Sequence, residues 1–206
     1  MIKFKKKNLS SSSKKWLQRQ HNDHYVLEAK RLGYRSRAFF KLEEIDKKYR
    51  FLKKNLNVLD LGSAPGSWSQ YLLNKKINNI LAIDILKMDQ IAGVMFIQGN
   101  FLENDIKQKI RKKYSDGIDL ILSDIAENTT GSKNTDSFKT NSICLDVLSF
   151  SKEMLAKKGK VLSKFFNGEL DKEIIAFAKN NYLSHKIIKP KTSRKDSKEM
   201  YIFCQI

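Results

Sequence analysis

Short apolar runs alternate with helix-compatible segments from residue 57 onward. Strands that alternate with helices in this way are typical of a parallel sheet that is covered by helices on both faces. The segments between the runs carry apolar side chains at helical spacing, and Gly159 follows the third of them as its expected C-cap. The strands are predicted at 57–61, 80–85, 94–98, 119–124 and 160–166, and the helices at 67–75, 104–113, 138–157 and 170–180.

Two more strands are predicted near the end of the chain, at 184–190 and 199–206. The polar link between them, KTSRKDSK, is short and suits an antiparallel pair better than a crossover connection. We therefore expect the last strand to run against the others. The predicted fold class is α/β, with a Rossmann-like, seven-stranded and mostly parallel sheet, an antiparallel last strand and helices on both faces.

The chain ahead of the first strand predicts two helices. Tyr25, Val26 and Ala29 have helical spacing, Gly33 ends that helix, and Ser36 is the expected N-cap of the next one. The apolar positions of this second helix are Phe39, Phe40, Leu42 and Ile45.

The basic side chains are concentrated at the start of the chain. The net charge is +18, and residues 1–55 hold 17 Lys or Arg against five Asp or Glu, whereas residues 56–206 hold 23 against 17. An excess of this kind predicts a polyanionic partner, above all nucleic acid, because lysines that neutralise phosphates release counterions. A solvated basic arm, or a lysine-rich genome composition, is the alternative explanation.

Four ranges describe the expected organisation. Residues 1–15 are low in complexity, and we expect them to form a basic arm that is disordered until an anionic partner binds. Residues 16–206 should form a single domain, with a basic helical prelude at 16–55 that contacts RNA and a core at 56–206 that carries the chemistry.

Other features exclude several classes of protein. No apolar run approaches the roughly 18 residues of a membrane span, and the N-terminus lacks the apolar stretch of a secretory signal. Cys144 and Cys204 lack CxxC spacing, so neither a disulfide framework nor a metal site is predicted. We expect a cytoplasmic protein without a membrane partner, and a monomer, because no apolar interface pattern is evident.

A glycine loop follows the first predicted strand. In VLDLGSAPGSW, Gly62 and Gly66 allow a ligand to approach the backbone, and Asp84 ends the next strand where an acid accepts hydrogen bonds from ribose hydroxyls. The pattern is not GxGxxG, and Pro65 leaves fewer N–H donors for a pyrophosphate. It therefore favours S-adenosylmethionine over NAD, which stays the alternative.

Four charged residues should meet at one edge of the sheet. Asp124 ends the fourth strand, Lys164 lies near the end of the fifth, and Glu199 begins the antiparallel last strand. Lys41, on the second helix of the prelude, could complete the set from above. A single strand lysine often reaches solvent, and a single aspartate at a strand end is often a turn residue. Their joint occurrence at one edge favours a catalytic site.

These residues resemble a known family. SSSKKWLQRQ, GYRSRAFFKLEEID, LDLGSAPGSWSQYLL, DLILSDIAENTTG, SKFFNGE and SRKDSKEMYIF are similar, in this order, to the FtsJ/RrmJ (RlmE) family of ribosomal RNA 2′-O-methyltransferases. The resemblance implies a single methyltransferase domain, S-adenosylmethionine as cofactor, and the ribose 2′-hydroxyl of a uridine in large-subunit rRNA as substrate, on an assembled or nearly assembled subunit. It implies Lys41, Asp124, Lys164 and Glu199 as the catalytic tetrad, and Gly66, Trp68, Asp84, Asn100 and Asp124 as cofactor positions beside Gly62.

Two positions depart from the family pattern. Asn100 replaces an aspartate that accepts from the adenine amino group, and an amide carbonyl can still accept. Glu127 replaces a proline and adds a negative charge near the expected path of RNA phosphate. We expect the departures to affect the fit of the target nucleotide more than the chemistry.

The sequence leaves the proton acceptor and the substrate open. A sulfonium methyl group is already activated, so the enzyme must align the ribose oxygen and remove a proton. Lys164 is either the base or a cation that positions the ribose while the proton leaves to water. A tRNA 2′-O-methyltransferase and an RNA-binding ribosome assembly factor without turnover are the alternative functions. We further expect Arg35 and Arg37 of the prelude to contact RNA phosphates.

Overall fold

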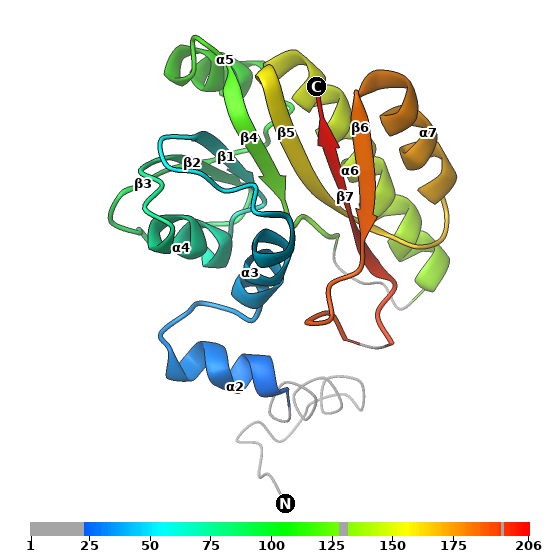
Figure 1. The fold of residues 1–206 in the computed structure, drawn as a ribbon, viewed down its shortest axis with the longest axis horizontal. Coiled ribbons are helices and arrows are strands. Elements are labelled where there is room, and N and C mark those ends of the chain that lie inside the picture. Colours follow the sequence, from blue (N-terminus) through cyan, green and yellow to red (C-terminus); the bar gives the residue numbers. More distant parts are fainter. Residues whose placement is uncertain (1–22, 128–131, 195) are drawn as a thin grey trace, which may run out of the picture.

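A computed structural model describes residues 23–127, 132–194 and 196–206, and the predicted arm at 1–15 lies outside them. Its centre is one seven-stranded sheet with the order β3-β2-β1-β4-β5-β7-β6 (Figure 1). The first five strands are parallel, and β7 is antiparallel to both of its neighbours. The predicted mostly parallel sheet with an antiparallel last strand is therefore confirmed. The strands are β1 (Asn57–Leu61), β2 (Asn79–Asp84), β3 (Val94–Gln98), β4 (Ile118–Ser123), β5 (Leu155–Phe166), β6 (Ser184–Ile188) and β7 (Glu199–Gln205).

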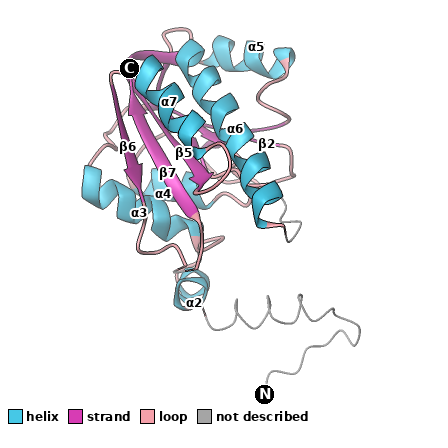
Figure 2. Cartoon of the chain, turned by 90° about the vertical axis from the view of Figure 1, so that its right-hand side faces the viewer, coloured by secondary structure: helices cyan, strands magenta, loops and turns pink. Residues whose placement is uncertain are grey.

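Helices cover both faces of this sheet (Figure 2). One face carries α3 (Ala38–Tyr49) and α4 (Ser67–Asn74), and the other carries α5 (Asn104–Lys113), α6 (Lys133–Met154) and α7 (Asp171–Asn181). A further helix, α2 (His24–Arg31), lies beyond α3, past the edge at which the parallel strands end (Figure 1). We call this edge the carboxyl edge and the opposite one the amino edge. None of the helices in the three described ranges is long and apolar enough to cross a membrane.

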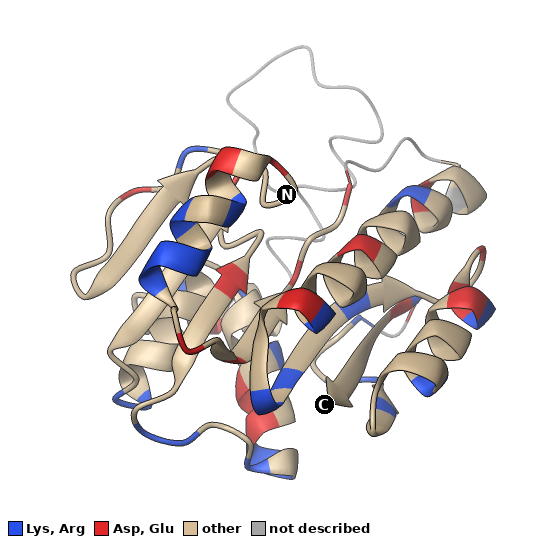
Figure 3. Ribbon diagram, turned by 90° about the horizontal axis from the view of Figure 1, so that it is seen from above, with Lys and Arg blue, Asp and Glu red and all other residues tan. Residues whose placement is uncertain are grey.

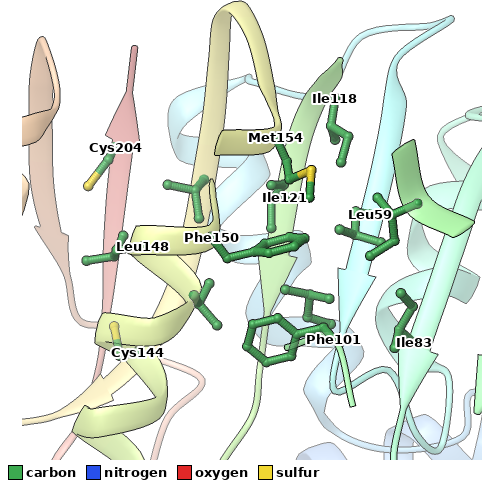
Figure 4. Close-up of a cluster of buried hydrophobic side chains, with 14 of the residues drawn as sticks. Leu59, Ile83, Phe101, Ile118, Ile121, Cys144, Leu148, Phe150, Met154 and Cys204 are labelled. Carbon is green, nitrogen blue, oxygen red and sulfur yellow. The ribbon is translucent and has the colours of Figure 1, made fainter. Parts of the chain in front are cut away.

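Strand alternation fills two separate cores. Leu59 and Leu61 of β1 pack with α5 and α6, whereas Val58 packs with α3 and α4 on the other face. Figure 4 shows Leu59 in the first of these clusters. Because successive side chains of a strand point to opposite faces, the near-continuous apolar runs of the sequence supply both cores. The carboxyl ends of the strands are thereby held in fixed positions next to one another.

The predicted end of the helix at 138–157 is wrong. The helix ends at Met154, and Gly159 is a buried residue inside β5 instead of a C-cap. Leu155 pairs with Ile118, yet the next pair joins Leu120 to Lys160, so β5 has extra residues that form a bulge. A Cβ on Gly159 would lie 2.7 Å from the carbonyl oxygen of Ala156. The glycine is therefore required by a close approach inside the bulge, a cause that the sequence pattern does not separate from capping.

The start of α3 differs from the prediction by one position. Arg37 is the N-cap by backbone geometry, but the Ser36 hydroxyl accepts a hydrogen bond from the backbone N–H of Ala38 at 3.2 Å. Ser36 also shares a 2.7 Å hydrogen bond with the hydroxyl of Ser67, the first residue of α4. The two helices of this face are thus joined where each begins.

Candidate active site

Two of the predicted residues meet at the carboxyl edge through β4 and β5. Lys164 is buried near the end of β5, and its Nζ lies 3.1 Å from Oδ1 of Asp124, the residue that follows β4. The same ammonium group donates to the backbone carbonyl of Asp124 at 2.6 Å. The lysine of the buried strand is therefore held by both the side chain and the backbone of its neighbour.

The other two residues complete a continuous chain of charges. Lys41 of α3 donates to Oε2 of Glu199 at 2.6 Å, and its Nζ lies 3.9 Å from Oδ2 of Asp124. Glu199 begins β7, so the antiparallel direction of that strand brings it to the carboxyl edge, as predicted. The structure thus joins all four predicted residues in the order Lys164, Asp124, Lys41 and Glu199.

The charges of this tetrad support one another. Burial alone would lower the pKa of Lys41, but the negative charges of Asp124 and Glu199 outweigh it and hold this pKa above its ordinary value. Burial alone would raise the pKa of Asp124, but the charges of Lys164 and Lys41 hold it below its ordinary value. Lys41 therefore stays a cation and Asp124 an anion throughout the neutral pH range.

Two residues that the sequence reasoning missed also hold the tetrad. The buried Tyr201 hydroxyl donates to Oδ1 of Asp124 at 2.6 Å, and the Ser193 hydroxyl donates to Oε1 of Glu199 at 2.7 Å. Tyr201 could have been found, because it lies two residues after Glu199 and therefore on the same face of β7, directly opposite Lys164. Ser193 lies in the link before β7, where no periodicity marks it.

A cavity of about 310 Å³ opens beside the tetrad at the carboxyl ends of β1, β2 and β4. Four of the residues predicted to bind the cofactor are among its lining residues: Gly62, Asp84, Asn100 and Asp124. A Cβ at Gly62 would lie 2.3 Å from Cγ1 of Ile125, so only glycine leaves this wall its present shape. Asp124 belongs to both the cavity and the tetrad and thus links the two.

The lining suits a nucleoside that carries a positive charge. Both carboxylate oxygens of Asp84 are fixed at 2.8 Å by backbone N–H groups, of Ala64 and Leu86. The Asn100 side-chain oxygen accepts from Leu102 N–H at 3.0 Å, which orients it in the cavity wall. Among the residues that the structure describes, four carboxylates and no Lys or Arg line the cavity, so a sulfonium cation is favoured there. These carboxylates are Asp84, Asp124, Glu127 and Asp146.

Comparisons with known proteins agree with this geometry. Residues 34–206 match the model of the FtsJ-like methyltransferase family. The chain belongs to this family. S-adenosylmethionine is accordingly its methyl donor, and the cofactor predicted from the glycine loop is confirmed.

Individual members are similar over most of their length. The chain is 40% identical to "Ribosomal RNA large subunit methyltransferase E" of Pelagibacter ubique, over 94% of this chain and 96% of that protein. It is 44% identical to the protein of the same name from Azorhizobium caulinodans, over 94% of this chain and 82% of that protein. The crystal structure of a ribosomal RNA methyltransferase from Plasmodium falciparum superimposes with a TM-score of 0.74 at 34% identity, covering 84% of this chain and 97% of that one.

Two of the predicted cofactor residues of this FtsJ-like chain do not line the cavity. The Trp68 indole N–H donates to the carbonyl of Ala38 at 2.9 Å, and its ring packs 5.9 Å from that of Tyr201. Gly66 is the N-cap of α4 at a φ of 109°, and a Cβ there would lie 2.6 Å from Cδ1 of Ile91. Packing thus explains the position of the Trp68 ring and the need for glycine at position 66, and a contact of either residue with the cofactor stays a prediction.

Arg35 and Arg37 both make contacts inside the protein, and their expected contact with RNA phosphates stays a prediction. The Arg35 guanidinium donates to the carbonyls of Pro65, Asp89 and Gln90, at 2.8, 2.7 and 3.0 Å. It therefore fixes the glycine loop against the segment that follows β2. The sequence offered no signal for this, because an arginine in a basic segment looks the same whether it binds carbonyls or phosphates.

Arg37 connects three separate segments. Its guanidinium lies 2.5 Å from Oδ2 of Asp23, the N-cap of α2, and donates to the carbonyl of Thr192 in the link between β6 and β7. Arg194 of that link lies 3.1 Å from the same carboxylate oxygen. The link that carries Ser193 is thereby fastened to the prelude.

Asp60 is a buried carboxyl that the tetrad does not use. It is 1% exposed in β1, and the Ser69 hydroxyl of α4 donates to it at 2.7 Å. Burial, together with the negative charges of Asp124 and Asp84, raises the pKa of Asp60 to about 7, against the opposing effect of the Ser69 hydrogen bond. Its charge state therefore changes within the neutral pH range.

Replacing Asp60 with asparagine should remove a pH-dependent loss of stability. In the unfolded chain the pKa of an aspartate is about 3.9, well below that of Asp60 in the folded protein. The free energy of unfolding is therefore highest below about pH 4, where Asp60 is protonated in both states. It falls by about 4 kcal/mol in total as the pH rises through about 7. Asparagine keeps an acceptor for Ser69 and has no charge to bury. Urea unfolding at about pH 4 and about pH 8 gives the drop in the free energy of unfolding between the two pH values. This drop should be smaller for Asp60→Asn than for the wild type, by about 4 kcal/mol.

The exposed Asp116 supplies the control, since Asp116→Asn removes a carboxylate in the turn before β4. This variant should follow the wild type at both pH values. If Asp60→Asn also follows the wild type, Asp60 does not cause the loss.

Proposed function

We propose that this chain transfers a methyl group from S-adenosylmethionine to the ribose 2′-hydroxyl of a uridine in large-subunit ribosomal RNA, on the assembled or nearly assembled subunit. The observation that carries the proposal is the tetrad itself, a chain of charges that includes Asp124, which also lines the cavity. The names of the relatives support rRNA of the large subunit as the substrate.

The mechanism assigns each residue a task at the ribose oxygen. The cofactor, when bound, supplies an activated methyl group, so the protein's own work is alignment and proton removal. Lys164 faces the reacting hydroxyl and either takes its proton or holds the oxygen as a cation. Asp124 fixes the Lys164 ammonium group at 3.1 Å, and Tyr201 holds that carboxylate in place.

Lys41 and Glu199 form the second pair of the site. Because Lys41 stays protonated, it acts as a fixed positive charge 3.9 Å from Asp124 and limits the negative potential at the site. Glu199 keeps this lysine in position at 2.6 Å and is itself fixed by Ser193. We assign the pair to positioning, and Lys164 to direct contact with the ribose.

The organisation of the chain follows from this assignment. We propose that residues 56–206 form the catalytic core of a single methyltransferase domain, that the prelude at 16–55 delivers RNA to the tetrad, and that residues 1–15 are a basic arm that binds phosphate. The proposal is supported by the position of Lys41, which brings α3 of the prelude directly to the site.

Transfer of labelled methyl from S-adenosylmethionine to large subunits tests the proposal. Subunits from cells that lack the modification should accept one methyl group per subunit at a ribose 2′-oxygen, and subunits that already carry it should accept none. Mapping of the label decides the nucleotide. Label on tRNA would show that tRNA is the substrate instead of large-subunit rRNA. If the protein binds the cofactor but transfers methyl to no RNA, the result would favour an assembly factor.

A further inference from the structure

A second charged site lies at the amino edge of the sheet, opposite the tetrad. It is a hollow of about 320 Å³ whose lining includes four lysines and one acid, Asp119. The Asp119 carboxylate already accepts a hydrogen bond from the backbone N–H of Asn57 at 2.8 Å. Four cations against one anion leave three unbalanced positive charges. The lysines of this lysine hollow are Lys53, Lys157, Lys158 and Lys160.

Distant segments of the chain build this hollow. Lys53 comes from the link between α3 and β1, and the other three come from the bulge of β5. The link and the bulge meet because Asn57, at the start of β1, donates a side-chain hydrogen bond to the carbonyl of Gly117 at 3.3 Å. A Cβ on that glycine would lie 2.9 Å from Cα of Ala156 in the bulge, so the two segments are in contact through it.

Ordinary structural roles do not account for these lysines. Lysines in the last turn of a helix interact favourably with its dipole, but α3 ends at Tyr49 and α6 at Met154, each at least three residues earlier. Within the described ranges, none of the four forms an ion pair with a carboxylate. Lys158 has a φ of 67°, a left-handed conformation that is unfavourable for lysine. The bulge thus presents lysines that no contact inside the protein explains.

Further basic side chains lie on α3 and β6. Lys48 and Lys186 lie over the ring of Tyr49, 5.3 and 5.5 Å from its centroid, between α3 and the edge strand β6. A larger hollow of about 650 Å³ lies between α3 and the link after β6, and its charged lining residues are four lysines and two glutamates: Lys47, Lys48, Lys189, Lys191, Glu43 and Glu44. Figure 3 looks down on the amino edge, where blue segments mark the basic residues of the ribbon.

We propose that the lysine hollow binds backbone phosphates of the substrate RNA, at a segment separate from the target nucleotide. This inference rests on the proposed function, since it assigns a second contact to the same substrate. Lys160 and Lys164 are four residues apart on β5, about 13 Å of strand, so one bound nucleotide does not occupy both sites. Such contacts fix the position of RNA without reading its sequence.

The charge and the lining favour RNA over an anionic membrane surface. Membrane binding by lysines is strengthened by apolar side chains that enter the lipid. Here the apolar lining residues are buried or half-buried: Phe51, Leu56 and Leu120. Flexible ammonium groups around an open hollow instead suit single phosphates.

A charge-neutral variant tests the inference with purified large ribosomal subunits as the probe. In this variant all four lysines of the hollow become glutamine. At about 0.15 M salt its Kd should rise at least about tenfold, and the slope of log K against log salt should become shallower by about three. Turnover of methyl transfer at saturating subunits should stay at the wild-type level, because the tetrad is untouched.

A matched control removes four charges elsewhere. The control replaces four exposed lysines with glutamine and so makes the same change in net charge. They lie on the face of the sheet opposite α3 and α4, on α5, α6 and α7: Lys109, Lys152, Lys172 and Lys179. This control should lose less than about twofold in affinity. Urea unfolding of both variants verifies that each is folded.

Three results would overturn the inference: equal losses in the two variants, wild-type affinity of the hollow variant, or a loss that affects anionic vesicles and not RNA. Failure of the proposed function gives a different result, because the wild type would then transfer no methyl to the subunits. The binding measurement does not depend on that transfer and still reports on the hollow.

Discussion

Replacing Lys164 with alanine should lower the turnover of methyl transfer by about a thousandfold or more, while the Kd for S-adenosylmethionine changes by less than about threefold. Lys164 is bound to Asp124 through two contacts, of 3.1 and 2.6 Å, and it is not among the lining residues of the cofactor cavity. The substitution therefore removes the group that we propose faces the ribose oxygen and leaves the lining of the cavity in place. Single-turnover transfer and calorimetric cofactor binding measure the two effects separately.

Lys164→Arg distinguishes the two roles that remain open for this residue. Arginine keeps a positive charge but does not lose its proton in proteins, so it replaces a positioning cation and not a base. Substantial activity of the arginine variant would identify Lys164 as a cation, and loss in both variants would identify it as the proton acceptor. Near-normal turnover of Lys164→Ala would exclude both roles. Removal of one member of a buried ion pair also destabilises the fold, so unfolding curves of each variant are needed beside the rates.

The tetrad could be predicted because it depends on topology. Once β4 and β5 are parallel and β7 is antiparallel, the positions of Asp124, Lys164 and Glu199 at one edge follow from where each strand begins or ends. Tyr201 follows from the same alternation. The positions of these residues could be predicted because strand direction decides at which edge of the sheet a residue lies, and side-chain alternation decides on which face.

The contacts of Arg35 and the bulge before Lys160 could not be predicted in this way. The Arg35 guanidinium binds carbonyls from two different loops, and no residue type marks a free carbonyl. The sequence AKKGK has the composition of a C-cap and therefore predicts a helix end where the structure has a bulge. Both features depend on irregular backbone, and irregular backbone is not marked by any repeating pattern of apolar and polar residues in the sequence.

The protein is strongly basic, but the cavity proposed for the cofactor is acidic, so the cavity and the rest of the protein favour ligands of opposite charge. In the described part of the chain, the cavity is lined by carboxylates and by no basic side chain, although the whole chain has a net charge of +18. Glu127, which we expected beside the RNA phosphates, is among the cavity-lining residues. A cationic cofactor is therefore favoured inside the cavity and a polyanion outside it, and Asp124 belongs to both the cavity and the tetrad.

Removing residues 1–22 should weaken binding to large ribosomal subunits at least about tenfold at 0.15 M salt, roughly the physiological value, without changing cofactor affinity. This segment holds seven Lys or Arg and no Asp or Glu. The cut leaves Asp23, which caps α2 and binds Arg37 and Arg194, so the prelude keeps its anchor. If all seven charges meet phosphates, the slope of log K against log salt should become shallower by about five.

A variant of full length in which these seven basic residues become glutamine separates charge from chain length. It should lose as much affinity as the truncation, because counterion release depends on charge and not on the presence of the segment. Wild-type affinity of the truncated protein would show that the arm does not contact the subunit, and a loss in the truncation alone would assign the contact to its uncharged side chains. A combined loss with the lysine-hollow variant equal to the sum of the two free energies would show that arm and hollow bind separate phosphates.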